Sequence, residues 1–285
     1  MMKDISEQIK RHFPAFSKGQ KKIANAILYD YDKVAYMTAA RFGQFVGVSE
    51  STVVRFAISL GYDGYSEFQR AVQDLVRTRL TPNQRIEITK QLTRGGDAIE
   101  KVMESDILKI RSSMEKLDRE VFHKAVDALL AAKTVYIVGA RSSELLARTL
   151  FYNLSLIFDN VKLVLPSSPA EVFEQMFSIG QEDLLFAFSF PRYSTKMIHA
   201  VHFAKKNGAR VIVMTDSDRS PLAEEADFLL KARSDMMSYM DSLVAPISII
   251  NAIIVEITNR REALITQRFD RLEKIWDEYS VYTKK

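Results

Sequence analysis

The sequence contains no cysteine among its 285 residues, which excludes disulfide bonds, thiolate metal sites and cysteine nucleophiles. It also has no long apolar run. The most apolar stretch, residues 243–255, is interrupted by Pro246, Ser248 and Asn251 and is shorter than the ~20 residues of a bilayer-spanning helix. The first 16 residues mix charged side chains with apolar ones, unlike a secretory signal. We therefore expect a soluble, cytoplasmic protein that needs neither a metal nor a cofactor.

What the chain does have is an ordinary globular composition, 47% hydrophobic and 27% charged, which excludes a disordered or collagen-like protein. Its length favours two domains. Breaks at Thr81-Pro82 and at the pair Gly95-Gly96 mark the region between them. We expect a helical domain over residues 1–80, a linker with a connecting helix over 81–110, and an α/β domain over 111–285.

The positive charge is concentrated in the first third of the chain. Residues 1–85 hold 13 Lys and Arg against 8 Asp and Glu, whereas the rest holds 27 against 28. A basic small domain joined to a neutral larger one is typical of proteins that bind a polyanion. The alternative is an ordinary solvated surface, on which such an excess is also common.

Residues 40–56 have the pattern of a helix-turn-helix motif. Two helices that cross closely need a small residue inside the first, here Gly43, and the tight turn needs a residue that tolerates positive φ, here Gly47. Ser49 is a good N-cap for the second helix, and Gly61 is placed to end it. The apolar residues spaced to fill the angle between the helices are Val48, Val53 and Phe56.

The second helix of this motif would expose residue types that contact phosphates and base edges in the major groove of DNA. Arg55 also has an alternative role, in which it fastens the helix to neighbouring acidic residues. A second alternative is an ordinary helical hairpin with two glycines. The candidate DNA-binding residues are Ser49, Ser51, Thr52 and Arg55.

Helix-start signals flank the motif on both sides. Ser17 with Gln20, and Ser66 with Gln69, have the spacing of a capping box. We therefore expect helices to begin after Ser17 and Ser66, which makes the first domain all-α.

The second domain alternates short apolar runs with helical segments such as 142–158 and 194–207. Continuous apolar strands that alternate with helices predict a parallel sheet buried on both faces. Right-handed crossovers then produce a three-layer αβα sandwich. The five expected strands are residues 134–139, 161–165, 183–190, 209–215 and 227–231.

Polar residues cluster where the first and third of these strands end. A helix N-terminus carries a partial positive charge of roughly +0.5, and neighbouring hydroxyl groups complete a phosphate cradle. The alternative is that the serines only cap the helices that follow. Clustering at two adjacent strand ends favours an anion site. Its candidate ligand-binding residues are Arg141, Ser142, Ser143, Ser189, Arg192, Ser194 and Thr195.

Residues 48–56 (VSESTVVRF) and 60–68 (LGYDGYSEF) together resemble the N-terminal domain of the RpiR/MurR transcriptional regulators. The resemblance implies that the first domain binds operator DNA. It also implies that the C-terminal domain is a SIS (sugar isomerase) domain that senses a phosphosugar.

The second half of the chain is also similar to the SIS fold over roughly residues 120–255. Residues 139–143 (GARSS) occupy the place of a Gly-x-Gly-x-Ser turn, and residues 189–194 (SFPRYS) that of Ser-x-Ser-Gly-x-Thr. The matching residues, implied to contact the sugar phosphate, are Ser143, Ser189 and Ser194.

Three positions depart from the SIS pattern. Arg141 and Arg192 each replace a glycine, and Pro191 replaces a serine. An Arg in each of two facing loops would add charge and bidentate hydrogen-bond donors. The hypothesis is a ligand more anionic than a simple hexose phosphate, or differently shaped. The alternative is that both guanidinium groups point to solvent.

SIS domains also occur in enzymes that interconvert ketose and aldose phosphates, which need a general base. The nearest acid is Glu144, whereas a capping box from Ser168 already explains Glu171. His199 and His202 lie a turn or more into their helix. Because no acid–base pair stands out, we expect a sensor without catalysis. A sugar-phosphate isomerase and a protein-binding module remain the alternatives.

One helix-turn-helix reads only a short half-site, so useful specificity normally takes two copies about 34 Å apart along the duplex, or a multiple of that spacing. We expect a homodimer or homotetramer whose interface uses the apolar segments 145–158 and 243–257. Residues 261–282 read as an amphipathic helix that packs on its own domain or on a partner.

Overall fold

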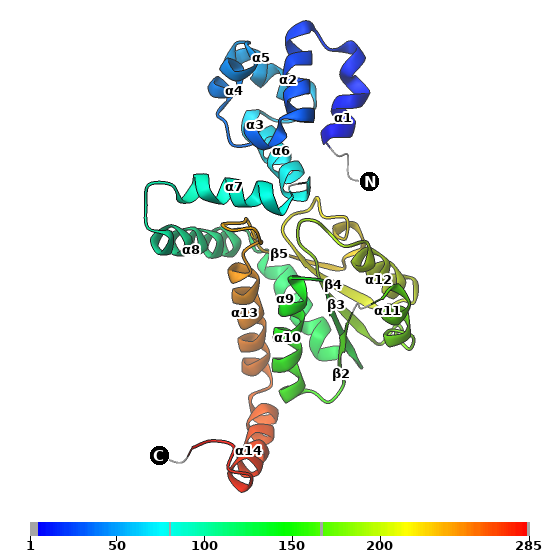
Figure 1. The fold of residues 1–285 in the computed structure, drawn as a ribbon. Helices are drawn as coiled ribbons and strands as arrows, with labels where there is room; N and C mark the ends of the chain where they lie inside the picture. The colour runs from blue at the N-terminus through cyan, green and yellow to red at the C-terminus, as the bar shows by residue number, and fades with distance from the viewer. Residues whose placement is uncertain (1–4, 80, 166–167, 284–285) are drawn as a thin grey trace. The chain divides into compact units, whose positions relative to one another are not determined.

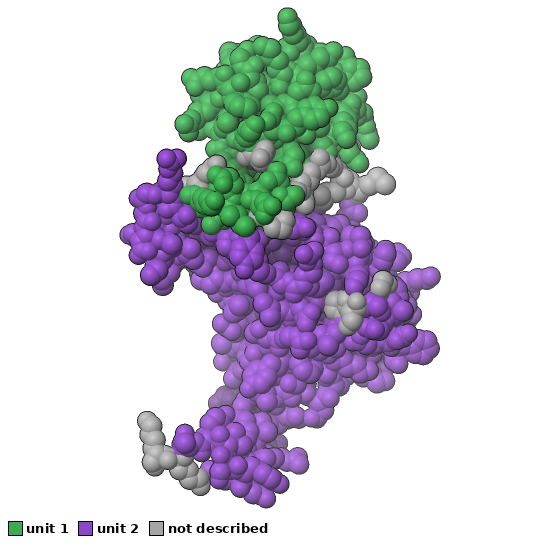
Figure 2. Space-filling view, viewed as in Figure 1, with its two compact units in different colours: residues 1–90 green, residues 91–285 purple. Residues whose placement is uncertain are grey.

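The computed structural model describes residues 5–79, 81–165 and 168–283 (Figure 1). The chain divides into two compact units, residues 1–90 and 91–285 (Figure 2). This division falls inside α7 (Pro82–Thr93), within the expected linker of 81–110. In the described part of the chain, no helix combines the length and the apolar character needed to cross a bilayer.

Unit 1 is built from helices, and aromatic packing holds its centre. Phe56 is fully buried and meets Phe16 and Phe68 edge-on, with ring centroids 5.1 and 5.8 Å apart. Edge-to-face packing of this kind adds about 0.5–1.5 kcal/mol per pair to the burial itself. Before α7 the helices are α1 (Ile5–His12), α2 (Lys18–Tyr29), α3 (Tyr31–Val34), α4 (Ala39–Val46), α5 (Glu50–Ser59) and α6 (Tyr65–Arg79).

The two predicted capping boxes have opposite outcomes. Ser17 caps α2 and exchanges both capping hydrogen bonds with Gln20, which confirms the first. The second is wrong, because α6 begins at Tyr65, before Ser66. The Gln69 side chain instead donates to the carbonyl of Met37, 2.7 Å away. A partner distant in the chain replaces the local one.

Unit 2 contains a five-stranded parallel sheet in the order β2-β1-β3-β4-β5. All five predicted strands are confirmed within two residues at each end. The central strands β1 and β3 are buried along their whole length, whereas the edge strands β2 and β5 are partly exposed. The strands are β1 (Val135–Gly139), β2 (Val161–Val164), β3 (Leu184–Phe188), β4 (Arg210–Thr215) and β5 (Phe228–Lys231).

Helices cover both faces of the sheet, which makes the predicted αβα sandwich (Figure 1). One face packs on α9 (Arg119–Ala131), α10 (Ser143–Ile157) and α13 (Val244–Arg260). The other packs on α11 (Pro169–Gln175) and α12 (Thr195–Lys206). The sheet therefore lies between two separate apolar layers.

Two further helices complete unit 2. The first, α8 (Ala98–Lys116), packs against α13. The second, α14 (Glu262–Glu278), follows α13 and extends away from the sheet (Figure 1). Ile265 is the buried residue of α14, and Arg268 pairs with Asp159. The predicted C-terminal amphipathic helix therefore forms and contacts its own unit.

Candidate functional site

The helix-turn-helix geometry of unit 1 follows from its two glycines. A Cβ built on Gly43 would lie 2.8 Å from the Val48 carbonyl oxygen, so α4 and the turn approach too closely for any side chain there. Gly47 ends α4 in the left-handed region, with φ 68°. Val53 and Phe56 are buried between the helices, as predicted, while Val48 is half-buried.

The four predicted DNA-binding residues lie at the N-cap of α5 and in its first two turns, and they differ in exposure and hydrogen bonding. Ser49 caps the helix: its hydroxyl accepts from the Thr52 amide at 3.3 Å and lies 2.8 Å from the Thr52 hydroxyl. Ser51 and Arg55 are exposed, and Thr52 is half-buried. No ion pair between Arg55 and an acidic residue is present in the described part of the chain, so the alternative fastening role has no support.

A lysine that sequence reasoning missed lies beside this motif. The Lys22 ammonium group would be 3.5 Å from a Cβ on Gly47, at the turn that leads into α5. A helix N-terminus carries a partial positive charge. A lysine beside it adds to that charge, and together they favour the binding of an anionic partner. The sequence signal was the run Lys21-Lys22, but only the packing of α2 against α5 brings it to this turn.

In unit 2 the candidate ligand loops meet at one point of the sheet. The strands β1 and β3 are neighbours, and Gly139 pairs with Phe188 at their carboxyl ends. The chain leaves β1 through α10 on one face and β3 through α12 on the other. This is the topological switch point of the sheet, where open parallel sheets bind ligands.

Both loops hold an arginine in a backbone conformation that normally favours glycine. Arg141 has φ 58° and Arg192 has φ 65°, and among the described residues Ser280 alone shares this property without being glycine. Gly139 is required for a different reason, since its Cβ would lie 2.3 Å from the Ser143 carbonyl oxygen. The two substitutions therefore keep the turn shape of the SIS pattern.

In the described structure the candidate serine hydroxyls of these two loops cap neither of the helices that follow. Ser142 and Ser194 stand at N-cap positions, yet neither side chain accepts a capping hydrogen bond. Ser143 and Ser189 are only 5% and 3% exposed as residues, and in the described structure their hydroxyls have no hydrogen-bond partner, although neither oxygen is fully enclosed. Thr195 lies on the exposed first turn of α12. Ser168, by contrast, caps α11 by accepting from the Glu171 amide at 3.2 Å.

Comparisons with known proteins agree with both halves of this description. A model of the helix-turn-helix domain of the rpiR family matches residues 3–78, and a model of the SIS domain matches residues 128–256. The chain belongs to the RpiR family of transcriptional regulators.

Two relatives align with nearly the whole of this chain. It is 27% identical over 272 residues to the transcriptional regulator HexR of Pseudomonas aeruginosa, covering 91% of each protein. It is 25% identical over 286 residues to HexR of Escherichia coli, covering 95% of this chain and 93% of that one.

Two solved structures share the fold. The sugar isomerase domain of an RpiR transcription factor from Sphaerobacter thermophilus has a TM-score of 0.60 and 22% identity, covering 62% of this chain and 98% of that one. The Vibrio vulnificus NanR protein complexed with ManNAc-6P has a TM-score of 0.60 and 20% identity, covering 96% and 98%.

In this RpiR-family protein the end of β4 adds a contact that sequence reasoning missed. The Tyr193 hydroxyl donates to the Asp216 carboxylate at 2.8 Å, and Thr215 donates to the same oxygen at 3.2 Å. The loop after β3 is thereby tied to the loop after β4. The polar residues at this strand end were visible in the sequence, but their pairing was not.

The acids and histidines considered as catalytic bases have other partners or face solvent. Glu144 accepts from Arg148 at 2.8 Å, one turn along α10. Glu171 and His199 are exposed, and exposed His202 lies 3.3 Å from Glu225. Among these described residues there is no buried histidine or acid that a neighbouring side chain orients as a general base.

Proposed function

We propose that this RpiR-family protein is a DNA-binding transcriptional regulator whose SIS domain binds a phosphorylated sugar or a related anionic metabolite, which alters its affinity for operator DNA. The observation that carries the proposal is a pair of serines at the switch point of the sheet, Ser143 and Ser189, which are largely buried as residues and whose hydroxyls have no hydrogen-bond partner in the described structure. Neither hydroxyl oxygen is fully enclosed, so both can bind a ligand at this strand end.

The ligand chemistry follows from the two loops. Ser143, Ser189 and Ser194, with the N-termini of α10 and α12, provide the donors of a phosphate cradle. Ser142 and Thr195 lie at its rim. Arg141 and Arg192 would bind a second acidic group, so the ligand carries more negative charge than a simple hexose phosphate. NanR, which shares the fold, was solved with ManNAc-6P, and this supports the phosphosugar class.

In unit 1, Arg55 and Ser51 would contact the duplex directly. Ser49 and Thr52 would lie against the phosphate backbone of the DNA. Two reading heads are needed for an operator, so the functional unit is a homodimer or homotetramer. The ligand changes operator affinity only as far as it binds the two arrangements of the heads differently.

DNA binding is tested with duplexes selected from a random pool and then titrated at several salt concentrations. Affinity should fall steeply with salt because Lys and Arg release counterions. Arg55→Ala should lose about 1–3 kcal/mol and relax the sequence preference. A salt-independent affinity would instead favour the protein-binding alternative.

Ligand binding is tested by thermal shift and calorimetry with hexose phosphates, sugar-acid phosphates and sugar bisphosphates. Ser189→Ala should weaken binding of every phosphorylated ligand. Arg192→Ala should weaken only ligands with a second acidic group, and unchanged affinity for these would contradict its role. Ser155→Ala is the matched control, because that serine is half-buried on α10, away from the two loops, and in the described structure its hydroxyl bonds only to the Tyr152 carbonyl.

We also propose that the SIS domain acts without catalysis. The support is that Glu144, the acid nearest the site, is engaged by Arg148. Incubation with hexose and pentose phosphates should leave them unchanged by NMR. Appearance of the isomeric sugar phosphate, lost on Glu144→Gln, would establish the isomerase alternative.

A further inference from the structure

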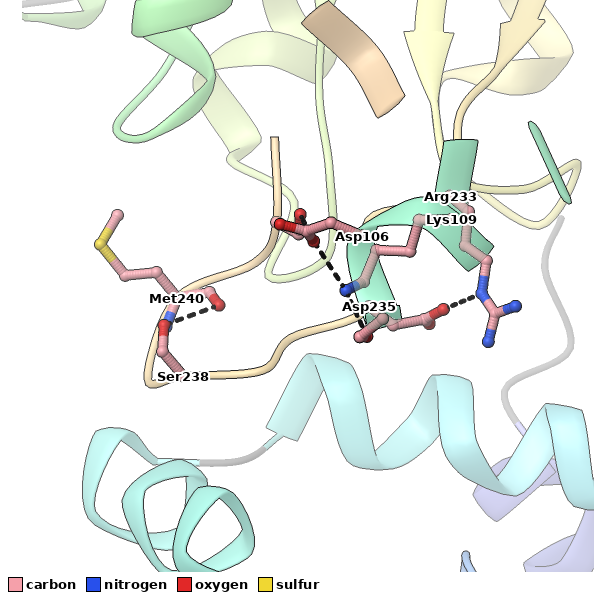
Figure 3. A network of polar contacts seen from close by, with 8 residues as sticks. Asp106, Lys109, Arg233, Asp235, Ser238 and Met240 are labelled. Carbon is pink, nitrogen blue, oxygen red and sulfur yellow. Dashed lines mark hydrogen bonds and ion pairs between the residues drawn. The ribbon is translucent and has the colours of Figure 1, made fainter. Parts of the chain in front are cut away.

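The helix α8 turns its polar side inward. Lys109 is 2% exposed, and its ammonium group donates to the Ser105 hydroxyl at 2.7 Å and to the Asp106 carboxylate at 3.1 Å (Figure 3). Asp106 also accepts from the Ser242 hydroxyl at 2.8 Å. Further along, the buried Ser113 hydroxyl accepts from the Arg233 amide at 2.9 Å. Hydrogen bonds to residues 233–242 therefore fasten α8 to its own unit.

The apolar side of α8 faces outward. At 100° per residue, five of its side chains fall within an arc of about 80° that runs the length of the helix. All five are exposed, and so the helix is amphipathic in the reverse of the usual sense. A monomer rarely leaves a contiguous apolar stripe of this size in water. We call this set the α8 stripe: Ile99, Met103, Ile107, Ile110 and Met114.

We propose that the α8 stripe is a two-fold interface with a second copy of this chain, in which the two α8 helices pack antiparallel. The proposed function requires two reading heads, and this contact joins them through unit 2. It does not depend on what DNA or ligand the protein binds.

The order of residues along α8 is self-complementary in this arrangement. Reversing the helix about its middle places Ile99 opposite Met114 and Met103 opposite Ile110, with Ile107 beside its own copy at the two-fold axis. Antiparallel packing also brings the same flank of both helices together.

The charges on that flank specify the same register. Glu104 and Arg111 are both exposed and follow the stripe on the side away from the buried polar face. Their positions place Glu104 beside the partner's Arg111, and by symmetry Arg111 beside the partner's Glu104. A parallel pair would lose both contacts, so the charge pattern selects the antiparallel dimer.

Because the chain has no cysteine, single cysteines report this interface directly. Ile107→Cys places two thiols at the two-fold axis, and mild oxidation of the full chain should link most of it as a disulfide dimer. Leu108→Cys is the matched control: Leu108 is 56% exposed against 55% for Ile107, but it points about 100° further round the helix. It should cross-link at least tenfold less.

Cross-linking is measured without DNA or ligand, so its result is separate from the proposed function. Equal yields from the two variants, or no dimer from Ile107→Cys, would overturn the interface. The second result would arise if unit 1 of the same chain covers the stripe.

A charge-reversal cycle tests the register. Glu104→Arg and Arg111→Glu should each raise the dimer dissociation constant about five- to tenfold in sedimentation experiments, because each creates like-charge contacts. The double variant should return within threefold of the wild type. Absence of this rescue, with both single variants folded by circular dichroism, would contradict antiparallel pairing.

Discussion

Arg141 and Arg192 share a left-handed backbone conformation, with φ 58° and 65°, in the two loops that follow the adjacent strands β1 and β3. For a residue other than glycine, this left-handed conformation costs about 1–2 kcal/mol of conformational energy. Strain of this kind collects at ligand-binding sites. The two arginines thus stand at positions where glycine would fit the backbone without strain, which supports their proposed role in ligand binding.

The first prediction separates folding from binding at these loops. The free energy of unfolding of the double variant Arg141→Gly, Arg192→Gly should lie within about 1 kcal/mol of the wild-type value. Relief of backbone strain in the folded state offsets the added flexibility of the unfolded chain. Its affinity for a doubly anionic sugar phosphate should fall at least tenfold by calorimetry. Arg271→Ala, an exposed change on α14, should alter neither quantity. Wild-type affinity in the double variant would contradict the binding role.

The second prediction concerns the crossing of α4 and the turn. Gly43→Ala should destabilise unit 1 by about 1–3 kcal/mol, because the new methyl group meets backbone atoms that are unable to move aside. Gly64→Ala is the control, since no atom lies within 4 Å of its Cβ. Denaturation followed by circular dichroism measures the loss. The fluorescence of the single tryptophan, Trp276 in α14, should be unaffected because it reports on unit 2.

The third prediction distinguishes the capping role of Ser49 from a DNA contact. Ser49→Ala removes the acceptor for the Thr52 amide and should cost about 1 kcal/mol of stability. Ser49→Asp keeps a good cap, and so keeps stability, but places a carboxylate against the phosphate backbone. Its DNA affinity should fall more than that of Ser49→Ala. If the Asp variant binds DNA as the wild type does, Ser49 lies outside the interface.

The fourth prediction concerns acid and α14. Two hydrogen bonds from Arg268, at 2.7 and 3.1 Å, hold the pKa of Asp159 below its ordinary value. A lowered pKa in the folded state means that the pair stabilises the docked helix above the ordinary aspartate pKa of about 3.9, and that this is lost as pH falls through the lower folded value. Trp276 fluorescence should report loosening of α14 in that range.

Asp159→Asn should show part of this change already at neutral pH. Asp270→Asn, on α14 itself and without an ion pair in the described structure, should behave as the wild type. A flat titration of Trp276 fluorescence in the wild type, or identical titrations of the two variants, would show that the Arg268 contact does not hold α14.

Several local features were predictable because they depend on residues close together in the chain. The strand ends, the turn at Gly47 and the cap at Ser17 each follow from the chemistry of a few neighbours. The capping box predicted at Ser66 is absent, and Gln69 instead bonds to the carbonyl of Met37, 32 residues away in the chain. Local signals fail where a distant group competes for the same hydrogen bond.

The sequence by itself determined that this protein has a helix-turn-helix head and a parallel α/β domain with hydroxyls and arginines at two strand ends, because spacing and residue type decide local conformation. Only the tertiary structure decided that Ser143 and Ser189 are largely buried with hydroxyls that lack partners, and that α8 turns its apolar side outward. Helical periodicity records that a face is apolar, but the direction in which that face points depends on how the helix packs.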